Sequence, residues 1–105
     1  MDENLQLLVN VDLENSIIGG ILKFPELMEK CLVKSDYFYY TNNKVIMRIM
    51  ENLYKEGIKP ELIAVINKAV ESKQLENAGG YKYIQEITHS EFSPITFEQN
   101  QRLLL

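Results

Sequence analysis

One segment of the chain carries an unbroken apolar stripe at the spacing of an α-helix. Side chains that favour burial recur three and four residues apart at Val45, Ile46, Ile49, Met50, Leu53 and Tyr54. This periodicity predicts an amphipathic helix that buries one face. Gly57 follows the stripe and is typical of a helix end, because glycine adopts a left-handed backbone conformation without steric cost. The rest of the chain must therefore supply apolar surface against which this helix packs.

The N-terminal third of the chain shows the same helical spacing. We predict a short helix over residues 2–10, a break at residues 10–12, and a second helix capped by Asp12. The second helix has its apolar stripe at Leu13, Ile17, Ile18, Ile21 and Leu22. Pro25 is expected to open the next helix, because proline is favoured in the first turn.

Helix signals continue to the end of the chain. Thr41 or Asn42 is expected to cap the helix of the unbroken stripe, Pro60 to open another, and Ser93-Pro94 to start the last one. No hairpin dipeptide and no alternating apolar run predicts a strand. The predicted fold class is all-α, a compact orthogonal bundle of about six or seven short helices.

Glycines are assigned geometric roles in this bundle. Gly19 lies inside an apolar helical stripe, where glycine costs about 1 kcal/mol relative to alanine, so we expect a neighbouring helix to approach it closely. Gly79 and Gly80 predict a sharp turn before a helix that carries Tyr83. Neither Gly19-Gly20 nor Gly79-Gly80 has the spacing of a phosphate-binding or dinucleotide-binding loop, so no residue is assigned to cofactor binding.

Composition argues against several classes of function. The 105 residues predict one domain over 1–105, and the net charge of −4 disfavours binding to nucleic acid. His89 and Cys31 are the sole histidine and cysteine, whereas a zinc site needs about four ligands. We therefore predict no catalytic residue and no metal site. The acidic N-terminus, the single thiol and the lack of a long apolar run predict a cytoplasmic protein that does not bind membranes.

Consecutive aromatic residues mark a candidate surface for partners. We expect residues 37–40 to form an extended connection whose rings fill the core, with one or two rings left exposed. The candidate partner interface comprises Tyr37, Tyr39, Tyr40, Phe97, Leu103, Leu104 and Leu105. Ordinary core packing is the alternative for each of them. Because three leucines end the sequence, we also expect that the chain has been cut within a longer protein.

Three segments in a fixed order carry a resemblance to a known family. They are Glu14-x-x-Ile17-Ile18-Gly19-x-Ile21-Leu22, then Asp36-x-Phe38-Tyr39 with Lys44-Val45-Ile46 and Leu53-Tyr54-Lys55-Glu56-Gly57, and finally Leu75-Glu76-x-x-Gly79-Gly80-x-x-Tyr83-Ile84-x-x-Ile87. Together they resemble the N-terminal domain of the bacterial DnaB-type replicative DNA helicase. The resemblance is clearest over residues 12–90.

The sequence departs from the family pattern at two places. The family often has histidine where Asn43 stands, and it has Ile-Asp-x-x-Thr where this chain has Pro60-Glu61-x-x-Ala64. These differences indicate a divergent member. Beyond about residue 92 the resemblance fades, and the family would continue there into a helical hairpin, a linker and an ATPase domain.

The resemblance implies a function in assembly rather than catalysis. In the family this domain forms a collar above a hexameric motor, associates with other copies of itself, helps to dock primase and in some systems responds to the helicase loader. ATP and Mg²⁺ belong to the motor domain, so the chain itself is expected to be neither an enzyme nor a direct DNA binder.

Two alternatives stay open at this point. One is a free-standing regulator with the same fold that binds a helicase, primase or loader. The other is a helix-turn-helix-like domain that binds nucleic acid through a helix over residues 44–55, which carries Lys44, Arg48 and Lys55 but also Glu51.

Overall fold

The computed structural model describes residues 3–89 and 94–104, and these residues form helices and connecting segments without any strand. In chain order the elements are α1 (Glu3–Lys23), η1 (Pro25–Lys30), η2 (Ser35–Tyr37), α2 (Thr41–Lys55), α3 (Leu62–Glu71), α4 (Tyr81–Ile87) and α5 (Pro94–Leu104), where η denotes a 3-10 helix. The predicted all-α fold class is confirmed.

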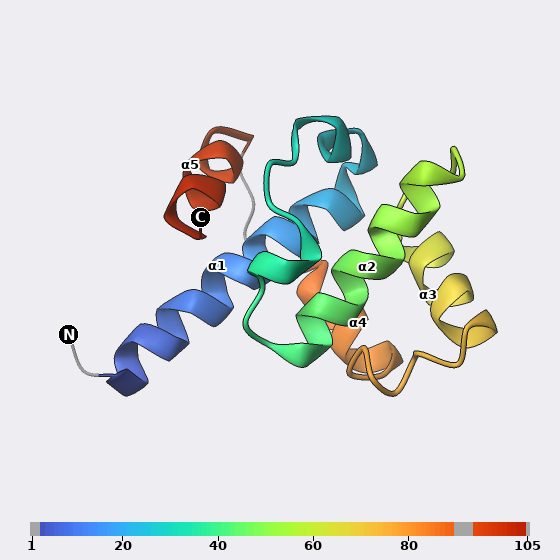
Figure 1. Cartoon of the computed structure of the whole chain (residues 1–105), viewed down its shortest axis with the longest axis horizontal. Coiled ribbons are helices and arrows are strands. Elements are labelled where there is room, and N and C mark those ends of the chain that lie inside the picture. Colours follow the sequence, from blue (N-terminus) through green and yellow to red (C-terminus); the bar gives the residue numbers. More distant parts are fainter. Residues whose placement is uncertain (1–2, 90–93, 105) are drawn as a thin grey trace.

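Helix α1 is the element around which the others are arranged. It contacts η1, α2, α4 and α5, while α3 packs against α2 and α4. Figure 1 shows α5 on one side of α1 and the group α2, α3 and α4 on the other, with the first turns of α1 extending beyond the rest. The radius of gyration, 12.8 Å, is that of a packed domain of this length, for which about 13 Å is typical.

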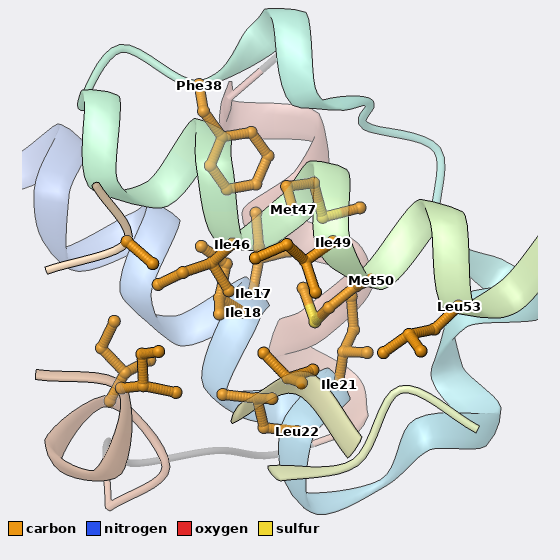
Figure 2. Close-up of a cluster of buried hydrophobic side chains, with 14 of the residues drawn as sticks. Ile17, Ile18, Ile21, Leu22, Phe38, Ile46, Met47, Ile49, Met50 and Leu53 are labelled. Carbon is orange, nitrogen blue, oxygen red and sulfur yellow. The ribbon is translucent and has the colours of Figure 1, made fainter. Parts of the chain in front are cut away.

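The core lies where α1 crosses α2. Figure 2 shows Ile17, Ile18, Ile21 and Leu22 of α1 facing a row of side chains from α2, namely Ile46, Met47, Ile49, Met50 and Leu53. Phe38, from the segment that precedes α2, fills one end of this cluster. The apolar stripe of the sequence is thus the buried face of α2, and its last member, Tyr54, is partly exposed.

Gly19 marks the closest approach between α1 and the end of α4. A Cβ atom at this position would lie 2.4 Å from the backbone carbonyl oxygen of Ile87. This distance is too short for a carbon–oxygen contact, so a side chain at Gly19 would displace the backbone of α1 or of Ile87. The absence of a side chain at Gly19 therefore lets α4 pack directly on α1.

Two helix boundaries near the N-terminus differ from the sequence prediction. The break at residues 10–12 is wrong, because α1 is continuous through Asn10, Val11 and Asp12. Asp12 is therefore an interior helical residue and not a cap. Asparagine and aspartate are only weakly unfavourable inside a helix, and the packing of the apolar face that follows outweighs this preference. Pro25 is the first residue of η1, as expected.

The starts of α2 and α3 also differ from the prediction. Helix α2 begins at Thr41, and Tyr40 occupies the N-cap position without a side-chain cap. Helix α3 begins at Leu62 with Glu61 at the N-cap, so Pro60 precedes the helix and does not open it. The predicted cap at Ser93 lies outside the described residues, and α5 begins at Pro94.

Left-handed residues end two of the helices and lead into a third. Gly57 has a φ of 78°, and the N–H of Ile58 donates to the carbonyl oxygen of Leu53 at 2.9 Å, which closes α2. Lys73 ends α3 in the same way with a φ of 59°. Gly79 and Gly80 have φ values of 99° and 88°, which turn the chain sharply into α4.

We predict that Gly19→Ala destabilises the fold through the contact with Ile87. Overpacking costs about 1–3 kcal/mol, and the higher helix propensity of alanine offsets about 1 kcal/mol, so we expect a net loss of about 1–2 kcal/mol. Urea unfolding followed by circular dichroism measures it. Asp12→Ala, at an exposed position of the same helix, is the control and should change stability little. Equal stability of the two variants would contradict the close approach.

Candidate protein-interaction site

The segment from the last residue of η2 to the start of α2 presents tyrosine rings to solvent. Tyr37 and Tyr39 are 52% and 65% exposed, whereas Phe38 between them is buried in the core. The rings of Tyr39 and Tyr40 meet edge to face, with their centroids 5.2 Å apart, and Tyr40 is half-buried. The segment therefore has one ring anchored inside and two rings available at the surface.

The carboxylate of Glu14 holds the backbone of this segment from inside. Glu14 lies on α1 and is fully buried. One of its oxygens accepts the N–H of Tyr39 at 2.8 Å, and the other accepts the N–H of Tyr40 at 3.4 Å and the side-chain amide of Asn43 at 2.9 Å. The carboxylate thus satisfies donors at the start of α2, where a carboxylate is also favoured by the helix dipole.

Asn43 extends the hydrogen bonds of Glu14 to a third helix. Its amide also donates to the side-chain oxygen of Asn15 at 3.0 Å, and its own oxygen accepts the hydroxyl of Tyr83 at 2.7 Å. Tyr83 belongs to α4, and its ring lies over Gly79, where a Cβ atom would be 2.4 Å from the ring. We call Glu14, Asn15, Asn43 and Tyr83 the buried network; it joins α1, α2 and α4.

The buried network leaves no polar group unsatisfied. Among the described residues, no buried side-chain nitrogen or oxygen atom lacks a hydrogen-bond partner. Burial raises the pKa of Tyr83 above its ordinary value, the nearby Glu14 carboxylate raises it further, and the hydrogen bond to Asn43 opposes both effects. The phenol is therefore held in its neutral form, in which its hydroxyl donates.

The roles of Glu14 and Asn43 do not follow from the sequence patterns. Asn43 is there a departure from the family pattern, and Glu14 is part of a motif. A signal for Glu14 was nevertheless present. It lies three and four residues before Ile17 and Ile18, in phase with the buried stripe of α1. A carboxylate in that position must find donors inside the protein.

The C-terminal part of the predicted interface is placed differently. Phe97, predicted as a candidate interface residue, is only 3% exposed and belongs to the core, because α5 packs along α1. Leu104 is partly buried against the same core, whereas Leu103 is exposed. Leu105 lies outside the described residues. On α5, Leu103 is thus the one predicted interface residue with an exposed side chain.

Polar contacts fix α5 to its neighbours. Gln101 is buried, and its side-chain oxygen accepts the N–H of Leu32. The side-chain amide of Asn100 donates to the hydroxyl of Ser16 at 3.0 Å. These contacts explain why Phe97 faces inward, since they set the rotation of α5 about its own axis.

No group of side chains in the described residues has the arrangement of a metal centre. Within them, no three His, Cys, Asp or Glu side chains cluster together. Cys31 donates from its Sγ to the carbonyl oxygen of Val33 at 3.2 Å, and burial raises the pKa of its thiol to about 11, so it is neutral and a poor nucleophile at pH 7. Across the helices described here, none is both long and apolar enough to cross a bilayer.

These features define an all-α module whose elements are joined by a buried polar network. The family model described as the DnaB-like helicase N terminal domain matches residues 6–104. The chain belongs to this family. This membership agrees with the resemblance found in the sequence.

Two relatives of this chain are replicative DNA helicases. The chain is 31% identical over 81 residues to the replicative DNA helicase DnaB of Pasteurella multocida, covering 75% of the chain and 17% of that protein. It is 26% identical over 96 residues to the DnaB of Rhodothermus marinus, covering 90% of the chain and 10% of that protein. The chain therefore spans less than a fifth of the length of these relatives.

Solved structures agree on the fold. The N-terminal domain of the DnaB helicase from Mycobacterium tuberculosis superposes with a TM-score of 0.82 at 17% identity, over 90% of this chain and 69% of that one. A DnaB-like replicative helicase, described together with its interactions with primase, matches with a TM-score of 0.78 at 26% identity, over 88% of this chain and 22% of that one.

We predict that Glu14→Gln weakens the buried network. Replacing one carboxylate oxygen with an amide group turns an acceptor into a donor, which leaves at least one of the facing N–H groups unpaired. An unpaired buried donor costs about 1–3 kcal/mol, and we expect a loss of that size in urea unfolding. Glu29→Gln, which alters an exposed carboxylate, is the control. If both variants unfold at the same urea concentration, the network does not stabilise the fold.

Proposed function

We propose that this domain acts as a non-catalytic head of a replicative helicase, which associates with other copies in a collar above a hexameric motor and helps to dock primase. The membership of residues 6–104 in the DnaB N-terminal domain family is the observation that carries this proposal. The likeness to a helicase described with its interactions with primase supports the second part.

The surface tyrosines fit a contact with another protein. Tyrosine is enriched in protein interfaces, because its ring covers much area while few rotatable bonds become ordered. Tyr37 and Tyr39 are exposed, Phe38 between them is anchored in the core, and the Glu14 carboxylate holds the backbone of Tyr39. A preorganised surface loses less entropy on binding than a mobile loop. A typical stable interface buries about 800 Å² on each partner, which a domain of this size is able to supply.

The remaining activities of a helicase are proposed to lie outside these residues. ATP and Mg²⁺ would be bound by the motor domain of the family. The chain's net charge of −4 argues against a direct contact with DNA, and Arg48, an exposed cation of α2, lies 3.9 Å from Asp36. A helicase loader is a further partner proposed for this head.

The proposal predicts self-association and binding to primase that depend on the exposed tyrosines. Sedimentation equilibrium should show a mass that rises with concentration, and calorimetry should show binding to the primase of the same organism. Tyr37→Ser combined with Tyr39→Ser should weaken at least one of these contacts. Tyr81→Ser is the matched control, since Tyr81 is equally exposed but lies at the start of α4.

A strictly monomeric chain at high micromolar concentration that also ignores primase would contradict the proposed function. If the double variant keeps both contacts, the proposed function is retained, but Tyr37 and Tyr39 do not contribute to these contacts.

A further inference from the structure

A groove opens between η1 and the C-terminal end of α2, away from the tyrosine segment. Its volume is about 300 Å³, and Pro25, Glu26 and Glu29 form one wall, while Tyr54, Ile58 and Lys59 lie on the other. In Figure 1 both elements lie at the upper edge of the molecule. We call this hollow the η1–α2 groove.

The apolar part of the η1–α2 groove is exposed and held in a fixed shape. Tyr54 and Ile58 are 40% and 45% exposed. Their backbones are tied by the hydrogen bonds that end α2, from Gly57 to Tyr54 and from Ile58 to Leu53. Gly57 adopts its left-handed conformation at the bend between them. The two apolar side chains therefore stay at the surface because the end of α2 directs them there.

The opposite wall carries negative charge. A 3-10 helix has about three residues per turn, so Glu26 and Glu29 lie above one another on the same face of η1. Both carboxylates are exposed, and neither takes part in an ion pair within the described part of the chain. On the other wall, the C-terminal end of α2 adds the partial negative charge of a helix dipole. Lys59 lies on the wall opposite η1, so the acidic side chains of the groove are those of η1.

We propose that the η1–α2 groove binds a segment of a partner protein that carries an arginine or lysine next to a large aliphatic side chain. The aliphatic side chain packs on Ile58 and Pro25, and the cationic side chain lies along the ring of Tyr54 with its charge towards Glu26 and Glu29. The inference rests on the proposed function, in that the partner is a protein recruited to the helicase head. The acidic wall is the feature that selects this partner over another copy of a chain whose own net charge is −4.

The test uses a synthetic helical peptide with leucine and arginine on one face and a twin in which each arginine is replaced by glutamate. Each is titrated into the isotope-labelled chain while its backbone NMR resonances are followed. We expect saturable shifts around Glu26, Tyr54 and Ile58 with the arginine peptide, and none with its twin. E26K/E29K should weaken binding about tenfold, because each exposed ion pair is worth a few-fold and reversal adds repulsion. E71K/E86K makes the same change of net charge elsewhere and should bind normally.

Three results would overturn the inference. These are shifts that map to another face, equal binding of the two peptides, and groove resonances that move with the concentration of the chain alone, which would assign the groove to a second copy. If the domain binds primase or itself but does not bind the arginine peptide, only the proposal for the η1–α2 groove is contradicted. The two proposals therefore fail separately.

Discussion

The carboxylate of Glu14 is the constraint on which the arrangement of three helices depends. Buried on α1, it accepts hydrogen bonds from the backbone at the start of α2 and from Asn43, which in turn binds Tyr83 on α4. A buried carboxylate is tolerated only where donors surround it, so each donor must keep its position. The interaction therefore stabilises one relative placement of α1, α2 and α4, which apolar packing alone would define less strictly.

Backbone geometry makes this placement possible. Gly19 lets the end of α4 approach α1 without a side chain between them, and Gly79 gives the Tyr83 ring room to lie over the turn. The same Glu14 contact fixes the backbone of the segment that exposes Tyr37 and Tyr39. The exposed rings therefore lie on a backbone that is held from the interior of the domain.

Much of the fold was accessible from the sequence, because periodic apolar residues report directly on helices and their buried faces. The stripe of α2 and the turn at Gly79 and Gly80 are examples. The start of α2 was not accessible from the sequence, because it is held by Glu14. This residue lies 26 positions before Tyr40, whose N–H it accepts. Local capping preferences could not reveal such a contact. Phe97 was misplaced for a similar reason: the rotation of α5 is set by distant polar contacts, including the one from Leu32 to Gln101.

Native-state hydrogen exchange at the amides of Tyr39 and Tyr40 tests the central claim most directly. Both N–H groups donate to Glu14, and no helical bond would otherwise protect them. If the carboxylate holds this segment, the two amides exchange nearly as slowly as those in the middle of α2, only when the domain unfolds as a whole. Exchange as fast as in a solvent-exposed loop would show that the segment opens freely and that Glu14 does not organise the fold.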